Sequence, residues 1–474
     1  MPLLNVTSSE IRTASQNIQK RFVKLELLNY QYQPVDEISG ICNAGTATID
    51  ANSDIRRTAS LSLTITDSSF EVESGGKIWL DKYIRLYVGT EDLVNGEIAW
   101  TNYGMYIIDS PSYEYNATNN TLTLSLLDMM AKLTGVRNGY LPGIPTVLKK
   151  DENIRKAIID TLALGGFTKY VVEEAPSPGT IPFDIELKQG STIYDILLSL
   201  KELYPFHEMF FDVNGTFYYK QIPTGKNDPV IIDDSLFDYI VSSEKIEPDF
   251  QNVKNSIEVY GRTQDPKHYA PESTVSGNVL TLNIASLTEY SEDVIYGFTL
   301  KDNPGYTSLQ VKINNMTAYP LKLDDGTTDA QIVAESGEVY YCIQFKKTYW
   351  LWLGHFQAYG KAEDTNPESP FNINSTIGRI HLPLYDGEYA NCYTDELAQQ
   401  RAEYELWLHT NMNNTLTLDC VPVYWLDVNL LTEYTLKRNG VKSKYLIKSI
   451  NIGFAPSDRM SLTMIKFYPE PEET

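Results

Sequence analysis

The sequence predicts a mainly β protein with a minor helical part, in the α+β class, and three observations lead to this prediction. Aromatic residues make up 12% of the 474 residues, and most of them are tyrosines, which favour strands. Short runs alternate apolar with polar residues, as half-buried strands do, and turns rich in Asn, Asp and Gly separate these runs. Only a few segments carry apolar residues at helical spacing. A chain of this length is expected to contain several domains.

Residues 1–140 are expected to form a short helix followed by an antiparallel β unit. Thr7 and Glu10 stand three residues apart, as in a capping box, so a helix is expected to begin here and to run to about residue 17. Strands then follow at short spacing, the clearest at 58–66, where every second residue is apolar. Closely spaced strands of this kind predict a closed or sandwiched antiparallel sheet.

The pattern changes over residues 141–236, where a small α+β subdomain is expected. Ile154 and Ile158 recur on one helical face before two glycines end the pattern. A second segment with the same spacing follows Ser191, which is a candidate N-cap. The Asn-Gly pair at 214–215 stands between two apolar runs and predicts a β-hairpin with a type I′ turn.

The rest of the chain is expected to form a second β unit that an insertion interrupts. Residues 237–263 and 376–474 would supply the strands of this unit. Residues 264–375, richer in Gly, Asp, Asn and Thr, would form an inserted β domain. Ahead of the closing strands, residues 394–409 carry the strongest late helical pattern, with Thr394 as its N-cap.

The charge of the chain argues against two classes of partner. Lys and Arg number 39 against 62 Asp and Glu, which gives a net charge of −23. Gripping a nucleic-acid backbone or an anionic membrane surface requires clustered cations, so neither is expected. No stretch approaches the roughly 18 apolar residues of a membrane-spanning helix, and the N-terminus lacks the basic and then apolar pattern of a secretory signal.

Motifs for catalysis, metals and cofactors are missing from the sequence. The four cysteines form no C-x-x-C pair, and the five histidines show no metal-binding spacing. There is no G-x-S-x-G elbow, phosphate-cradling loop or G-x-G-x-x-G motif. We therefore expect no enzyme activity, no bound metal and no cofactor.

An aromatic run at 346–360 has two interpretations. Trp350, Trp352 and Phe356 are candidate residues of a platform for sugar rings. Trp350 and Trp352 also share one face of a strand, so they can equally pack into a small core. Both interpretations stay open. The first would make the chain a carbohydrate-binding receptor protein that uses this aromatic insertion.

The late helix carries a candidate interface. Leu397, Arg401, Tyr404 and Leu408 recur at helical spacing on one face. An arginine in such a stripe indicates a paired carboxylate, because its guanidinium donates a two-pronged fork that lysine cannot reproduce. Arg401 and Tyr404 are therefore expected at an interface, and Gln399 is expected on the outer face.

Three blocks of sequence resemble one protein family. The first runs from IQKRFVKLEL through RRTASLSLTITD to KIWLDKYIRLYVG, and the second is KNSIEVYGR. The third and most specific runs from IGRIHLPLYDGEYANCYTDELAQQRAEYELWLHTN to the closing strands KYLIKSINI and MSLTMIKFYP. These blocks are similar to tail and baseplate hub proteins of long-tailed bacteriophages and of prophages of Gram-positive bacteria. The segment at 311–354 resembles a small β module common in phage tail proteins. The resemblance covers most of the chain and lies in patterns of strands, so it concerns fold and assembly.

The resemblance implies an architecture and a set of partners. Family hub proteins are trimers in which each chain carries two related antiparallel β-barrels, here 1–140 and the split pair 237–263 and 376–474. Three chains would form a ring of six barrels that adapts the sixfold tail tube to a threefold tip. The implied partners are the tail tube or distal tail protein, the tape-measure protein and other baseplate or fibre proteins. The protein would reside in the tail tip or baseplate of the virion, after assembly in the cytoplasm of the bacterial host.

The acidic charge then has two interpretations. A channel lined by carboxylates would repel phosphates, so that DNA passes through it without specific binding. Alternatively, the excess charge keeps the monomer soluble before assembly. A wall-degrading enzyme is a third functional hypothesis, and no motif supports it.

Overall fold

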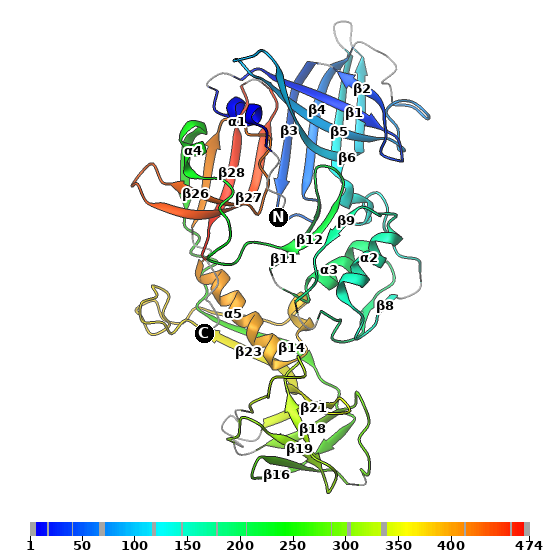
Figure 1. Cartoon of the computed structure of the whole chain (residues 1–474), viewed down its shortest axis with the longest axis vertical. Helices are drawn as coiled ribbons and strands as arrows, with labels where there is room; N and C mark the ends of the chain where they lie inside the picture. The colour runs from blue at the N-terminus through cyan, green and yellow to red at the C-terminus, as the bar shows by residue number, and fades with distance from the viewer. Residues whose placement is uncertain are drawn as a thin grey trace.

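The computed structural model describes residues 6–468 apart from short gaps, and its fold is mainly β with few helices, as the sequence predicts. The residues outside this description are 1–5, 17–18, 40, 66–71, 116–119, 144–145, 177–178, 205, 286, 301–304, 333–338, 412–413, 456 and 469–474. Figure 1 shows an elongated arrangement. Two β lobes lie side by side at one end, an α+β subdomain and helix α5 lie in the middle, and the inserted β domain lies at the other end.

The N-terminal lobe is an antiparallel sheet that follows a short helix. The predicted capping box is confirmed, because the Glu10 N–H donates to Thr7 Oγ1 at 3.2 Å and the Thr7 N–H donates to the Glu10 carboxylate at 2.8 Å. The helix ends at Ala14 rather than near residue 17. Strands pair in the order β3-β4-β7-β6-β5-β1-β2. The elements are α1 (Ser8–Ala14), β1 (Arg21–Leu28), β2 (Pro34–Ser39), β3 (Ile41–Asp50), β4 (Arg57–Ile65), β5 (Tyr83–Glu91), β6 (Ile98–Tyr115) and β7 (Asn120–Asp128).

The C-terminal lobe continues the same sheet. Residues 449–453 of β27 pair antiparallel with residues 46–50 of β3, and this pairing makes one sheet of 12 strands. Apolar side chains of both lobes form one continuous core, with Leu61 from the first lobe and Leu418 from the second. The elements are α4 (Asp234–Ile240), β13 (Val241–Glu247), β25 (Thr415–Cys420), β26 (Leu431–Thr435), β27 (Lys442–Gly453) and β28 (Met460–Lys466).

The middle subdomain packs two helices against small sheets. The predicted apolar faces are buried, with Ile154 and Ile158 in one core with Met105 of β6, so this subdomain is joined to the N-terminal lobe. The predicted hairpin forms, but its turn spans residues 212–216 and the Asp212 carboxylate closes it. The elements are η2 (Met129–Lys132), β8 (Thr146–Leu148), α2 (Ile154–Leu164), β9 (Tyr170–Val172), β10 (Ile185–Leu187), α3 (Ile193–Lys201), β11 (His207–Phe211) and β12 (Phe217–Gln221).

The inserted domain folds around a core of its own. Eight strands pair in the order β15-β18-β21-β22-β20-β19-β17-β16, and their apolar side chains form a separate cluster that includes Phe298 and Trp350. The elements are β15 (His268–Ala270), β16 (Glu272–Ser276), β17 (Val279–Asn283), β18 (Ile295–Leu300), β19 (Gln310–Ile313), β20 (Tyr319–Lys322), β21 (Val339–Phe345) and β22 (Trp350–His355).

A three-stranded sheet and helix α5 stand between the lobes and the inserted domain. The expected domain boundaries place residues 256–263 in the second β unit and residues 357–363 in the insertion, but the structure pairs these two segments with each other. The alternation in 256–263 showed only that one face is buried. The cover over Ile257 and Val259 is α5, not the large sheet. The elements are β14 (Ser256–Thr263), β23 (Gln357–Glu363), β24 (His381–Leu384), η3 (Gly387–Asn391) and α5 (Asp395–Asn411).

Helix α5 contacts this sheet through small side chains. Ala398 and Ala402 are fully buried, and a Cβ on Gly360 would lie 2.2 Å from the backbone of Ala398, so this glycine permits the close approach. The expectation that Gln399 lies on the outer face is wrong. Its side-chain oxygen accepts a hydrogen bond of 2.9 Å from a backbone N–H of β23, whereas Gln400 is exposed.

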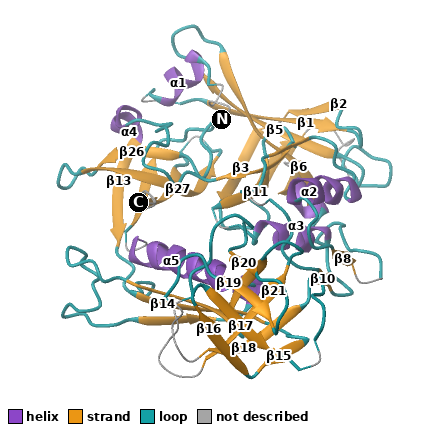
Figure 2. Ribbon diagram, turned by 60° about the horizontal axis from the view of Figure 1, so that its bottom comes forward, coloured by secondary structure: helices purple, strands orange, loops and turns teal. Residues whose placement is uncertain are grey.

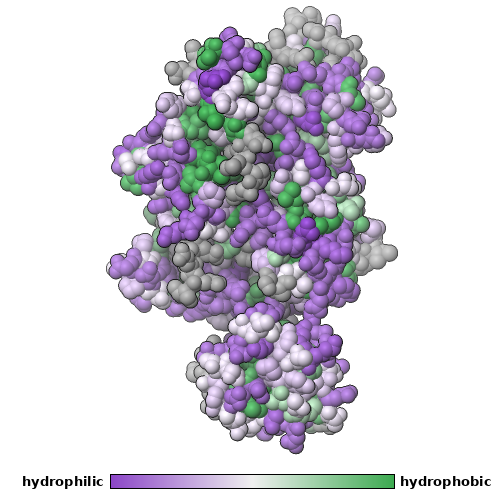
Figure 3. Space-filling view, in the orientation of Figure 1, coloured by the Kyte–Doolittle hydropathy of each residue, from purple (hydrophilic) through white to green (hydrophobic). Residues whose placement is uncertain are grey.

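One face of the molecule is mostly polar. Figure 3 shows polar and charged residues over most of the visible face, with apolar residues gathered over the C-terminal lobe. None of the helices that the structure describes combines the length and the apolar character needed to cross a bilayer.

Candidate functional site

The predicted sugar platform does not form around the two tryptophans. Trp350 is 0% exposed and Trp352 is 8% exposed, and both belong to the core of the inserted domain. The indole N–H of Trp350 donates to the carbonyl oxygen of Val311 at 2.9 Å. Neither ring presents a face to a ligand, which corrects the platform interpretation for these two residues. Phe356, in contrast, is 46% exposed.

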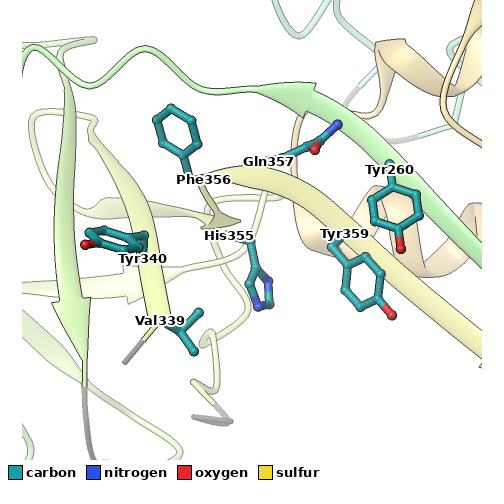
Figure 4. A pocket seen from close by; sticks show the side chains of 7 residues that line it. All are labelled: Tyr260, Val339, Tyr340, His355, Phe356, Gln357 and Tyr359. Atoms are coloured by element: carbon teal, nitrogen blue, oxygen red, sulfur yellow. The ribbon is translucent and has the colours of Figure 1, made fainter. Parts of the chain in front are cut away.

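Phe356 lies in an exposed groove where the inserted domain meets the three-stranded sheet (Figure 4). The volume of this aromatic groove is about 340 Å³. Tyr340 stands with Phe356 on one side, and the rings of Tyr260 and Tyr359 stand 5.3 Å apart on the other. The residues that line the aromatic groove are Tyr260, Val339, Tyr340, His355, Phe356, Gln357 and Tyr359.

The Asp395 carboxylate, at the start of α5, fixes the backbone beneath the aromatic groove. It accepts hydrogen bonds from the backbone N–H groups of His355 and Tyr359, each at 2.9 Å, and lies 2.7 Å from Nδ1 of His355. It also occupies the space that a Cβ on Gly354 would need, and Gly354 has a φ of +91°. One carboxylate thus ties the inserted domain to α5.

A polar cleft of about 420 Å³ lies between α3, β11 and α5, and it contains the two predicted interface residues. The Arg401 side chain is 11% exposed, with its Nη2 2.6 Å from Glu388 Oε2 and its Nε 3.3 Å from Glu405 Oε1. Arg401 therefore pairs with carboxylates of its own chain, which are the expected partners of its guanidinium. The Tyr404 ring packs edge-on against Phe206, with 4.3 Å between ring centroids.

The opposite wall of this cleft holds a buried charge cluster around Glu208. Arg56 Nη2 lies 2.5 Å and Lys220 Nζ lies 3.3 Å from its two carboxylate oxygens, and the Asn429 amide donates to it at 2.6 Å. Lys448 Nζ donates to the Asn429 side-chain oxygen at 3.0 Å. Burial, together with the charge of Arg56, lowers the pKa of Lys448 to about 8, although Glu208 opposes the shift. The cluster joins segments from both lobes and the middle subdomain.

The main path of the large sheet ends at β13 and β2 in the described part of the chain. Among the described strands, β13 pairs only with β25 and β2 pairs only with β1, and Figure 2 shows them at opposite sides of the molecule. Exposed apolar residues lie in both edge strands or close to them in the sequence. Near β13 they are Tyr239, Ile246 and Phe250, at 73%, 36% and 78% exposure, and near β2 they are Tyr30 and Val35, at 69% and 53%.

The described residues include no cluster of three or more His, Cys, Asp or Glu side chains placed to hold a metal ion. Burial raises the pKa of the Cys342, Cys392 and Cys420 thiols to between about 11 and about 12, so these thiols are protonated and unreactive at neutral pH.

Sequence reasoning missed most of the residues that build the aromatic groove. Tyr260 follows the buried Ile257 and Val259, and strand alternation places it on the opposite face of the strand. Its exposure could therefore have been predicted from the sequence. Asp395 follows the helix cap Thr394. Because acidic residues are common at helix N-termini, the sequence offered no reason to assign Asp395 to the groove. Tyr340 had no local signal, because its contacts come from distant strands.

Comparisons with known proteins identify a shared fold. A family model described as a domain of unknown function (DUF5048) matches residues 368–470, and no curated protein matches the chain. A tail protein from Neisseria meningitidis MC58 is similar with a TM-score of 0.51 and 10% identity, over 94% of this chain and 96% of that chain. The 43 kDa tail protein of prophage MuSo2 from Shewanella oneidensis gives a TM-score of 0.52 and 12% identity, over 93% and 98% of the two chains. At these identities the likeness is one of fold.

Proposed function

We propose that this chain is a structural, non-enzymatic protein of a bacteriophage tail, and that it acts as a trimeric hub in the tail tip or baseplate. The observation that carries the proposal is the fold, which two tail proteins share over 94% and 93% of this chain. The likeness spans the two lobes, the middle subdomain and the inserted domain together. It therefore favours a common role in assembly over the sharing of a single domain between unrelated proteins. The Gram-positive origin remains a prediction, since these two relatives come from Neisseria and Shewanella.

The two lobes give the proposal its geometry. Each chain carries two antiparallel β lobes that the pairing of β27 with β3 joins into one continuous sheet. Three copies around a threefold axis would present six such lobes in a ring. That ring would match the sixfold symmetry of a tail tube on one side and a threefold tip on the other.

The open edges of the sheet supply the contact between copies. A threefold ring needs a head-to-tail interface, in which two different surfaces of the same chain meet. The edges at β13 and β2 are different, and both are flanked by exposed apolar side chains. Unprotected strand edges invite further pairing, so closing them in a trimer would also prevent aggregation.

The same ring would form part of the DNA channel. With a net charge of −23, the inner surface would repel DNA phosphates and allow passage without specific binding. The tail tube or distal tail protein, the tape-measure protein and other baseplate or fibre proteins would be its neighbours. The virion tail, assembled in the host cytoplasm, would be its location.

Mass photometry over a range of concentrations, with negative-stain images of the oligomer and of tail particles, tests the proposal. We expect a closed trimer with a central channel. Ile246→Glu, on the β13 edge, should shift the population to monomer. Val275→Glu, on β16 of the inserted domain and 37% exposed against 36% for Ile246, should not. A monomer at all concentrations and in tail particles would refute the trimer. A trimer that Ile246→Glu leaves intact would refute the β13 interface.

A further inference from the structure

We propose that the aromatic groove is a binding site for a neutral saccharide. The groove lies at the junction of β21 and β22 of the inserted domain with β14 and β23 of the three-stranded sheet. It does not use Trp350 or Trp352, which are buried. It can be tested independently of the trimeric hub.

The exposed rings are the first observation behind this proposal. Tyr340 is 54% exposed and Phe356 is 46% exposed, and Figure 4 shows both on one side of the groove. The neighbouring Tyr269 is 42% exposed, and its ring centroid lies 5.9 Å from that of Tyr340. Exposed aromatic side chains grouped in this way are typical of interaction sites, whereas single exposed rings are not.

The backbone beneath these rings is fixed, which is the second observation. The Phe356 N–H donates to the Tyr340 carbonyl oxygen at 3.0 Å, and the Phe356 carbonyl oxygen accepts from the Gln264 N–H at 2.8 Å. The Asp395 carboxylate holds the backbone on both sides of Phe356, through the N–H groups of His355 and Tyr359. A backbone held in this way loses little conformational freedom on binding, so the positions from which the rings project are preorganised.

The chemistry of the lining selects the ligand. Among the described residues of the lining, His355 is the only imidazole, lysine, arginine or carboxylate side chain, and it is paired with Asp395. These described residues therefore offer no free counter-charge to a charged ligand. A pyranose ring has apolar C–H faces that stack on aromatic rings and a polar rim that suits tyrosine, histidine and glutamine side chains. The volume of about 340 Å³ lies in the range of small-molecule sites and is too small for an extended proline-rich peptide.

The position of the groove leaves it reachable in an assembled particle. The inserted domain lies at the far end of the chain from the two β lobes (Figure 1). A ring built through those lobes would keep this end outside the contacts between copies. A saccharide on a surface that a tail approaches could therefore enter the groove.

Ligand-detected NMR and calorimetry on the full chain test the proposal, with maltotriose, cellotriose and tri-N-acetylchitotriose as probes. We expect saturable binding of at least one probe, with an affinity that added salt does not change, since the ligand is neutral. Phe356→Ala and Tyr340→Ala should each weaken that binding at least about tenfold. Because both side chains are half-exposed, we expect both variants to melt like the parent.

Tyr385→Ala is the matched control, because Tyr385 is 64% exposed and lies outside the groove. It should bind like the parent. The proposal is overturned if no probe binds saturably, if Phe356→Ala and Tyr340→Ala bind as well as Tyr385→Ala, or if a proline-rich peptide binds the groove and the saccharides do not. None of these results would bear on the trimer, which is measured separately.

Discussion

Replacing Glu208 by glutamine should loosen the junction where three parts of the chain meet. Glu208 lies on β11 of the middle subdomain. Arg56 reaches it from the connection between β3 and β4 in the N-terminal lobe, and Asn429 reaches it from the segment before β26 in the C-terminal lobe. Lys220, on the neighbouring strand β12, completes the cluster. The carboxylate is thus the common acceptor that holds the middle subdomain against both lobes.

The expected magnitude follows from the burial of this cluster. Glu208 is 7% exposed and Arg56 is 4% exposed, so the pair lies outside bulk water. Burial raises the pKa of Glu208, but Arg56 and Lys220 outweigh that effect and hold it below the ordinary value of 4.5. Glutamine keeps the shape and removes the charge, which leaves the Arg56 guanidinium buried without a counter-charge. Losing one partner of a buried pair costs about 3–5 kcal/mol of unfolding free energy.

The pH dependence has a definite sign. Because the folded pKa of Glu208 lies below the unfolded one, the stability that its ionised form contributes is complete above pH 4.5. It is lost as the pH falls through the lower folded pKa. The difference between the parent and Glu208→Gln should therefore be largest at neutral pH and shrink in acid.

Hydrogen exchange and urea unfolding together measure the effect. A chain with several cores does not promise one two-state transition, so exchange in residues 207–221 and 427–431 reports the junction directly. The control is Glu247→Gln, which breaks an exposed ion pair with Lys245. The side chains of Glu247 and Lys245 are 54% and 68% exposed, so the loss of this pair should cost below about 1 kcal/mol. If Glu208→Gln changes exchange and unfolding no more than this control, the reasoning about the junction is wrong.

Three further predictions follow from single contacts. Arg401→Ala should lower the free energy of unfolding by about 3–5 kcal/mol in urea titrations, because it leaves the Glu405 carboxylate, whose side chain is 5% exposed, without the Arg401 charge, and Arg401→Lys should recover only part of the loss. Gly360→Ala should push α5 away from β23 at a cost of about 1–3 kcal/mol, whereas Gly225→Ala, with no atom within 3.4 Å of the new Cβ, should melt like the parent. Burial lowers the pKa of Lys448 from 10.5 to about 8. Between pH 8 and pH 10.5 the unfolded chain therefore binds one more proton than the folded chain, and the free energy of unfolding should rise with pH by about 3 kcal/mol across this range. Lys448→Met should remove that rise in pH-dependent unfolding.

Local patterns were enough to predict the elements that local contacts form. The capping box at Thr7 and Glu10 and the cap at Thr394, whose hydroxyl oxygen accepts from the Leu397 N–H at 3.2 Å, both act within one helical turn. The late helix was expected over 394–409 and spans Asp395–Asn411. The hairpin at 207–221 formed, but its turn type did not follow the Asn-Gly pair, because the Asp212 carboxylate offers the turn backbone a competing set of acceptors.

Contacts between distant segments could not be predicted in the same way. A strand's alternation reveals that one face is buried but carries no information on what covers it. For residues 256–263 the cover is α5, which lies more than a hundred residues later in the chain. The close approach of α5 depends on Gly360, and nothing next to that glycine in the sequence distinguishes it from a turn glycine. The Glu208 cluster is invisible for the same reason.

The aromatic run shows where a finer reading of the sequence would have separated core from site. Trp350 to Leu353 is an unbroken apolar run, and strands of that kind are buried on both faces. The structure has Trp350 and Trp352 in one core and Leu351 and Leu353 in another, so neither face of β22 is open to a ligand. Beyond Gly354 the chain leaves this sheet for the next one, and at that crossing Phe356 turns outward. Of the three candidate platform residues, the one that can meet a ligand is therefore Phe356, which lies where the chain crosses from one sheet to the next, and not the two tryptophans of the apolar run.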